Sequence, residues 1–184
     1  MLKVITGNPG TGKHTITKYI AKKLGLEIVD INKIAKNKKI FKRINGVLEV
    51  DTTKLKKIID KISLRDSILV GHLAPYVISQ KNVEVAIVLR RNPYKLRSIY
   101  KKREYTSKKS LENLGSEVLG VIYYDAIHGF GKNKTFQIDT SNKSISATVK
   151  KIESIFAGTK IKEDQVDWLQ LILKKGDMKK FFSY

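Results

Sequence analysis

The chain has 184 residues, 41% of them hydrophobic, which suffices for one domain with a substantial core and falls short of two full domains. It has no cysteine, which excludes disulfides, thiolate metal sites and thiol nucleophiles. A formal net charge of +20 is typical either of a protein that contacts polyanions such as RNA or of a solvated, lysine-rich surface.

Membrane and export signals are missing from the sequence pattern. No apolar stretch approaches the roughly 20 residues that a membrane span needs. The first residues resemble a strand that enters a turn rather than a secretory signal. We therefore expect a cytoplasmic protein without membrane contact.

The N-terminal part alternates apolar runs with amphipathic helices, in the order strand 2–6, helix 16–24, strand 26–29, helix 55–62 and strand 67–70. Gly25 ends the first helix. A polar, lysine-rich segment at 31–50 interrupts the alternation, and Asn45-Gly46 within it is a turn signal.

The remaining elements are predicted in the order strand 83–89, helix from 93, long helix 111–129, strand 135–138, helix 145–156 and a helical stretch at 166–173. The charged segment 101–109 is expected to be mobile, and the Lys/Phe-rich end of the chain to be loosely held. Strands that are apolar on both faces and alternate with helices predict an α/β fold with a parallel sheet covered on both sides. Inserted segments at about 31–50 and 101–112 are typical of active-site lids.

One motif carries the chemistry, GNPGTGKHT at 7–15, between the first strand and the first helix. Gly10 and Gly12 let the backbone curl so that its N–H groups point at phosphate oxygens, and the helix N-terminus adds partial positive charge. Lys13 supplies a point charge for the β- and γ-phosphates. The sequence therefore predicts a nucleoside triphosphate site.

The position after Lys13 departs from the usual motif, which has Ser or Thr there to bind Mg²⁺. His14 is a poor ligand for so hard an ion. Either the ion is held through waters and the nucleotide phosphates, or Thr15 helps to hold it. His14 can instead donate a hydrogen bond to phosphate.

Phosphoryl transfer needs further cations. Five arginines fall where phosphates could be reached: Arg43, Arg90, Arg91, Arg97 and Arg103. Arg103 lies at the entrance of the second predicted lid. His72 follows the third strand and could orient a water or a phosphate, or serve the core alone.

These motifs together resemble the archaeal branch of the adenylate kinase isoenzyme six family over nearly the whole chain. The matching segments are GNPGTGKHT at 7–15, EVD at 49–51, GHLA at 71–74, LRRNP at 89–93, REY at 103–105, KSLEN at 109–113, Glu117, DT at 139–140 and VDW at 166–168.

The resemblance implies a P-loop NTPase fold with a five-stranded parallel sheet in a single domain, 1–184. It implies an NMP-binding insert at about 28–51, a LID at about 103–113 and a C-terminal tail at about 166–184. ATP would lie at the phosphate loop, AMP at the insert, and Arg103 would close from the LID. The implied reaction converts ATP and AMP into two ADP, with a weaker ATPase activity. The family is also linked to a small-subunit ribosomal protein and to rRNA maturation.

This sequence lacks an acidic residue that the family has two positions before the histidine matching His72. Val70 occupies that place, so Mg²⁺ loses an outer anchor. We expect ATP hydrolysis to suffer more than transfer to AMP, because AMP brings its own nucleophile. A Val70→Glu variant without increased hydrolysis would count against this.

The leading prediction is an adenylate kinase in which Lys13 and Arg103 stabilise charge, with Arg43, His72 and Arg90 as candidate phosphate or NMP contacts. The alternative is a ribosome-assembly factor that uses ATP as a switch. Its basic protein partner would need an acidic patch, expected around Glu112, Glu117 and Asp125. A kinase of another small metabolite would need an acceptor site that rejects AMP, and no such signal is present.

Overall fold

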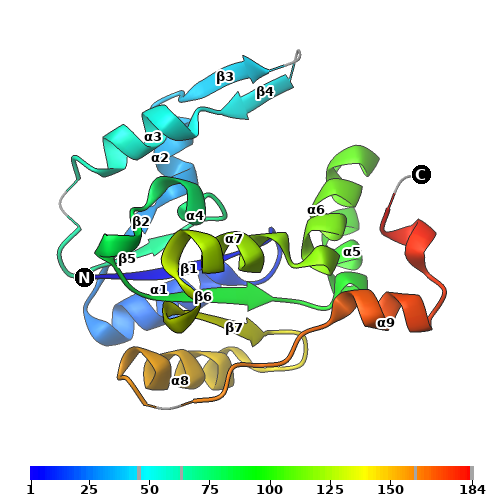
Figure 1. Ribbon diagram of the computed structural model, residues 1–184. Helices are drawn as coiled ribbons and strands as arrows, with labels where there is room; N and C mark the ends of the chain where they lie inside the picture. The colour runs from blue at the N-terminus through cyan, green and yellow to red at the C-terminus, as the bar shows by residue number, and fades with distance from the viewer. Residues whose placement is uncertain (45–46, 63, 160, 183–184) are drawn as a thin grey trace.

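The computed structural model describes residues 1–44, 47–62, 64–159 and 161–182, so the predicted turn at Asn45-Gly46 lies outside the described residues. The predicted parallel sheet is confirmed (Figure 1). Its strands are β1 (Leu2–Gly7), β2 (Glu27–Asp30), β5 (Ser67–Val70), β6 (Val83–Arg90) and β7 (Thr135–Asp139). They pair in the order β2-β5-β1-β6-β7, all parallel.

Helices cover both faces of this sheet, and each face has its own apolar core. One face packs on α1 (Lys13–Leu24) and α8 (Ile145–Phe156). The other packs on α2 (Ile31–Asn37), α3 (Thr52–Ile59), α4 (Ala74–Val77) and α7 (Val121–Phe130). A third apolar cluster joins α5 (Pro93–Lys102), α6 (Ser107–Leu119) and α9 (Trp168–Lys174).

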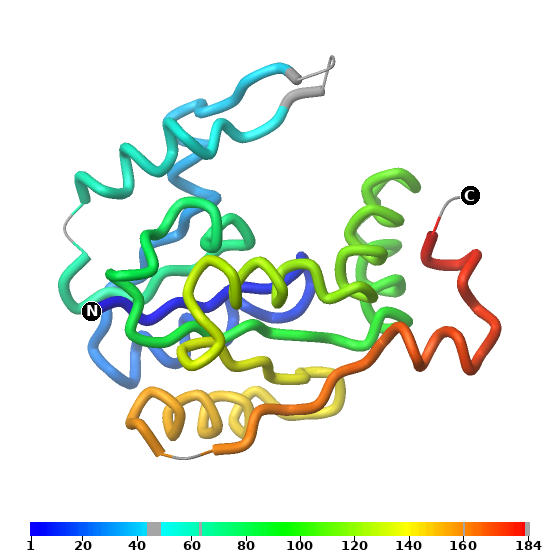
Figure 2. The backbone as a smooth tube through the Cα atoms, viewed as in Figure 1, coloured from blue at the N-terminus to red at the C-terminus, as the bar shows by residue number. Residues whose placement is uncertain are grey.

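The polar segment between β2 and β5 is an ordered insert rather than an irregular loop. It contains α2, an antiparallel hairpin of β3 (Phe41–Ile44) and β4 (Val47–Val50), and α3. Asp30 caps α2 and Asp51 caps α3, each by accepting a backbone N–H of its helix. The hairpin extends away from the central sheet (Figure 2).

The predicted long helix 111–129 is wrong, because the chain breaks at Gly120 into α6 and α7. Gly120 has φ +69, which favours glycine, and ends α6. A Cβ atom there would lie 3.3 Å from Nη1 of Arg90. Apolar spacing alone gave no sign of this break, since it continues across Gly120.

Two segments expected to be loose are structured. Most of 101–109 belongs to α5 and α6, which leaves a short turn at 103–106. Near the C-terminus, the Phe181 side chain is fully buried and meets the Tyr94 ring edge-on at 5.0 Å. The tail is therefore tied to α5 by aromatic packing.

All five parallel strands of the sheet end at one edge, and four of them end with a polar or glycine residue, while β5 ends at Val70. β1 leads into the phosphate loop, β5 into Gly71-His72, and β2 ends at Asp30. Ligands of open parallel sheets bind at this edge. In the part of the chain that the structure describes, no helix has the length and apolarity that a membrane crossing requires.

Candidate active site

The phosphate loop leaves β1 at Gly7 and enters α1 at Lys13. A Cβ atom on Gly7 would lie 2.4 Å from the carbonyl oxygen of Leu89, so only glycine allows β1 to run this close to β6. Gly12 caps α1 with φ +94. Apart from its two chain neighbours, none of the described residues has an atom within 4 Å of where its Cβ would stand, so the space beside the helix N-terminus is open. This is the geometry that an anion needs.

Lys13 is almost fully buried at the start of α1, and its Nζ lies 3.2 Å from the Asn8 carbonyl oxygen, to which it donates. Burial, together with the positive charge of Arg103, lowers the pKa of Lys13 to about 8. A buried lysine whose charge is disfavoured by burial and by a nearby arginine forms a site that an anion would complete.

A cavity of about 390 Å³ opens in front of this loop. Its walls come from the loop and α1, from the insert, from the β5 end and from the turn before α6. The lining residues are Pro9, Gly10, Gly12, Lys13, His14, Thr15, Asn32, His72, Arg103, Tyr105, Lys109 and Asn113. The structure thus brings together most of the predicted phosphate-site residues, including Arg103 and His72.

His72 faces Lys13 from the end of β5. Burial lowers its pKa to about 4, and the Lys13 charge acts in the same direction, so the ring is neutral near pH 7. Nδ2 of Asn32, which is a donor only, lies 3.0 Å from Nδ1 of His72. That contact leaves the proton on Nε2, and the ring can therefore donate one hydrogen bond from that nitrogen.

Behind the phosphate loop, the side chain of Glu117 is fully buried and accepts hydrogen bonds from four groups. The donors are Nδ2 of Asn8 at 2.8 Å, Nε of Arg90 at 2.9 Å, the backbone N–H of Arg91 at 3.0 Å and Nε1 of Trp168 at 3.1 Å. This network, the Glu117 brace, ties the loop to α6, β6 and α9. A buried carboxylate so well satisfied holds a fixed position.

Two further hydroxyls hold the loop. Tyr100 on α5 donates to the carbonyl oxygen of Pro9 at 2.7 Å. Oγ1 of Thr140, after β7, donates to the carbonyl oxygens of Thr11 and Arg90, each at 3.0 Å. The loop is therefore fixed from three sides before any ligand binds, which reduces the ordering cost of binding.

Arg90 does not reach the cavity, which corrects its prediction as a phosphate contact. Its side chain is buried, and its guanidinium donates to Glu117 and to Oε1 of Gln137 at 3.0 Å. Arg43 lies exposed on the hairpin and does not line the cavity, so its contact with a nucleotide stays a prediction. Position in the sequence could not separate a buried arginine from one that faces a ligand.

A second cavity, of about 290 Å³, shares Gly12 and Thr15 with the first. Thr140, Ser141 and Arg91 form its other side. Nε of Arg91 is buried and has no hydrogen-bond partner in the described structure. The two cavities therefore meet over the N-terminus of α1, where an extended ligand could occupy both.

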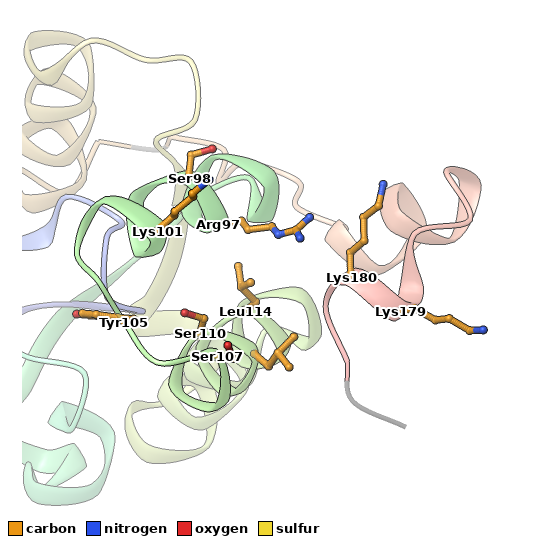
Figure 3. A pocket seen from close by; sticks show the side chains of 10 residues that line it. Arg97, Ser98, Lys101, Tyr105, Ser107, Ser110, Leu114, Lys179 and Lys180 are labelled. Atoms are coloured by element: carbon orange, nitrogen blue, oxygen red, sulfur yellow. The ribbon is translucent and has the colours of Figure 1, made fainter.

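The cavity in Figure 3 is larger, about 700 Å³, and lies between α5, α6 and the 3₁₀ helix Met178–Lys180. Arg97 extends into it from α5, and Lys180 lies across from it. Nζ of Lys180 forms an ion pair with Oδ1 of Asp177 at 2.7 Å. This groove lacks the glycine loop and helix N-terminus of a phosphate site, and exposed lysines are common in this chain. Arg97 therefore lies apart from the candidate active site.

Among the described residues, no group of three His, Asp or Glu side chains could hold a metal ion. An ion at this site would therefore rest largely on waters and on a ligand's own oxygens. Thr15, predicted to help hold Mg²⁺, lines the cavity. Imidazole stays a poor ligand for a hard ion, and burial lowers the pKa of His14.

Asp30 and Asn32 are site residues that sequence reasoning missed. Asp30 ends β2 beside His14, and Asn32 begins α2 beside His72. Their place at the end of a strand gave a signal, because the sheet brings all strand ends to one edge.

The chain is similar to known protein families and proteins over most of its length. Residues 4–120 match the protein family described as "AAA domain". A "Putative adenylate kinase" of Thermococcus onnurineus is 31% identical over 170 residues, which cover 91% of each chain. Another of that name, from Methanocaldococcus jannaschii, is 32% identical and covers 98% of this chain and 94% of its own.

Solved structures support the fold alone. Shikimate kinase from Acinetobacter baumannii, in complex with shikimate, superimposes with a TM-score of 0.59 at 16% identity, covering 88% of this chain and 95% of its own. Deoxyadenosine kinase from M. mycoides with bound dCTP gives 0.51 at 18% identity, covering 86% and 100%. The chain therefore belongs to the AAA-domain family, and it is related over most of its length to archaeal proteins named "Putative adenylate kinase".

Proposed function

We propose that the protein is a nucleoside monophosphate kinase that transfers the γ-phosphoryl group of ATP to AMP. The observation that carries the proposal is the convergence of Lys13, Arg103 and His72 on one cavity at the N-terminus of α1. The names of the archaeal relatives support the same reaction class.

ATP fits the pair of cavities that meet at Gly12 and Thr15. Its phosphates would lie over the glycine loop and the start of α1, where N–H groups and the helix dipole favour negative charge. Its nucleoside would lie on the side of Thr140 and Arg91. The unpartnered Nε of Arg91 is then a donor for that part of the ligand.

Transfer requires that charge on the moving phosphoryl group be neutralised while donor and acceptor are held in line. Lys13 is fixed by its bond to the loop, and Arg103 faces it from the turn between α5 and α6. Neutral His72 can donate from Nε2 to a phosphate oxygen. No general base is needed, because the acceptor phosphate is already an anion.

The acceptor would approach from the insert, because Asn32 of α2 forms that wall of the cavity. The exposed hairpin with Arg43 and Lys42 offers cations that could close over a second phosphate. This division agrees with the NMP-binding insert and LID expected from the sequence. Both assignments belong to this proposal.

The assembly-factor alternative gains no specific support from the structure. The acidic patch expected for a basic ribosomal protein fails at Glu117, which is fully buried in the brace. Glu112 is exposed, while Asp125 accepts a hydrogen bond from Tyr76. The predicted ribosomal protein and rRNA contacts therefore stay predictions.

The test is a coupled assay of ADP formation from ATP and Mg²⁺, with and without AMP. We expect AMP-dependent ADP formation that Lys13→Ala abolishes. Lys18→Ala, an exposed lysine on the same helix, is the matched control and should keep wild-type activity. A panel of other monophosphates and of hydroxyl acceptors then ranks the acceptors.

Slow or absent turnover despite tight ATP binding would contradict the kinase proposal and favour a switch. Faster turnover with a hydroxyl acceptor than with AMP would move the protein to another class of small-molecule kinase. Loss of activity in Lys18→Ala as well would show that disruption of helix α1, rather than loss of the Lys13 charge, explains the effect of Lys13→Ala.

A further inference from the structure

The last residue of β5 in this chain has no carboxylate side chain. Val70 is the last residue of β5, and its side chain is buried. It stands two residues before His72, which lines the phosphate cavity. A kinase that uses Mg²⁺ needs an oxygen-rich outer shell around the ion, and Val70 supplies none.

The neighbouring strand supplies a carboxylate at the same level. Asp30 is the last residue of β2 and is the Cα partner of Val70 in the parallel pairing of β2 with β5. Partner residues in adjacent parallel strands project their side chains from the same face, with the strands about 4.8 Å apart. Asp30 therefore places a carboxylate at the same edge and on the same face as residue 70, displaced by one strand.

The contacts of Asp30 fix this carboxylate. Oδ1 accepts the backbone N–H of Lys33 at 3.0 Å, which caps α2. Oδ2 lies 3.4 Å from Nδ1 of His14, the residue that replaces the usual Ser or Thr after the loop lysine. The side chain is 24% exposed, so the carboxylate is partly open to solvent.

The charge of Asp30 reaches the groups around the cavity. It raises the pKa values of Lys13, His14 and His72, against the larger lowering effect of burial on each. Glu117, by contrast, is occupied by the brace behind the loop. Asp30 is thus a carboxylate that lies beside His14, a residue lining the cavity, and whose charge acts on the cavity's titratable groups.

A second oxygen acceptor lies nearby without a donor. Oδ1 of Asn32 is buried and has no hydrogen-bond partner among the described residues, although Nδ2 of the same amide contacts His72. An unpaired buried carbonyl costs free energy, so its presence in a ligand cavity points to a donor that arrives with the ligand. A carboxylate and an amide oxygen match the acceptors that waters on a hydrated Mg²⁺ require.

We propose that Asp30, with Asn32 beside it, anchors the water shell of the Mg²⁺ that accompanies ATP, in place of a carboxylate at the end of β5. The inference rests on the proposed binding of ATP at the phosphate loop. When bound, Mg²⁺ neutralises phosphate charge. His14 then serves as a neighbour that keeps Oδ2 of Asp30 turned toward the loop.

The decisive variant is Asp30→Asn, which keeps the size of the side chain and its ability to cap α2 while removing the charge. Asp51→Asn is the matched control, because Asp51 caps α3 through the same contact, to Lys54 N–H at 3.0 Å. ATP binding is measured by calorimetry over a series of free Mg²⁺ concentrations and in excess EDTA. The readout is the Mg²⁺ concentration that gives half of the full gain in ATP affinity.

We expect Asp30→Asn to raise that Mg²⁺ concentration by roughly ten-fold or more. In EDTA the same variant should bind ATP as tightly as the wild type or more tightly, since a negative charge near the phosphates is gone. Asp51→Asn should stay within about two-fold of the wild type under both conditions.

An unchanged Mg²⁺ requirement in Asp30→Asn would overturn the inference. So would an equal loss of ATP affinity with and without Mg²⁺, which would indicate a purely structural role. A wild-type protein that binds no ATP, or that binds it equally well after Lys13→Ala, would instead refute the proposed function. The two failures are therefore distinguishable in one set of titrations.

Discussion

The two sides of the phosphate loop are built in opposite ways. Behind the loop, the Glu117 brace and Tyr100 form a buried polar network that holds the backbone. In front, the insert carries a hairpin whose described side chains at 41–43 and 49 are exposed. The rear is organised before ligand binds, while the front keeps its charges in solvent. Substitutions behind the loop should therefore alter stability, and those in front should alter function alone.

The largest expected effect comes from removing the centre of the brace. Glu117→Ala leaves the guanidinium of Arg90 buried without its carboxylate, which should lower the free energy of unfolding by about 3–5 kcal/mol. Glu112→Ala, exposed on the same helix, should change it by less than about 0.5 kcal/mol. Urea unfolding followed by circular dichroism measures both. Equal effects of the two substitutions would contradict the asymmetry between rear and front.

The next largest effect is expected from removing Arg103, which lies in front of the loop. Arg103→Ala should lower the rate of phosphoryl transfer by roughly 10²–10³-fold, because one charge that stabilises the transition state is lost. Its unfolding free energy should stay near the wild-type value, since Arg103 is exposed. Arg97→Ala is the control, because Arg97 lies on α5, the helix that precedes the turn of Arg103, and faces the cavity of Figure 3; it should keep the rate within about two-fold. Single-turnover kinetics would separate the two.

A smaller effect follows from the pKa of Lys13, which burial and Arg103 lower to about 8 in the free protein. Above that pH the free lysine is neutral, whereas phosphate binding favours its charged form, so binding takes up a proton. ATP affinity should therefore fall by up to about ten-fold per pH unit above about pH 8. Lys13→Arg keeps its charge and should show a flat profile between about pH 7 and 9.5. An equally steep profile in that variant would place the titrating group elsewhere.

The same asymmetry explains what the sequence could predict. Five strands and the phosphate loop were predictable because apolar runs and glycine spacing are local signals. The break at Gly120 was not, since the apolar spacing from Leu114 to Ala126 continues through it. Its cause is long-range, because Gly120 packs against the Arg90 guanidinium.

The candidate site was predictable in part, because residues that follow the ends of parallel strands meet at one edge of the sheet. Lys13, His72 and Arg103 follow strand ends or lie in a turn, and the cavity brings them together. Arg90 also follows this rule, yet it turns inward, because Glu117 arrives from a helix 27 residues away in sequence. Asp30 escaped notice because its importance depends on pairing with Val70, a register that no single-strand pattern reveals.

The smallest effect tests whether the rear network serves binding as well as stability. Tyr100→Phe removes the donor to the Pro9 carbonyl and should cost about 1 kcal/mol of unfolding free energy. Tyr94→Phe, on the same helix, removes a comparable bond to Oδ2 of Asp177 at 2.7 Å and should cost a similar amount. Only Tyr100→Phe should also weaken ATP binding, by a few-fold, because only its hydroxyl touches the phosphate loop. If both variants bound ATP as tightly as the wild type, the loop would hold its shape without this bond, and the preorganised rear would reduce to the Glu117 brace and Thr140.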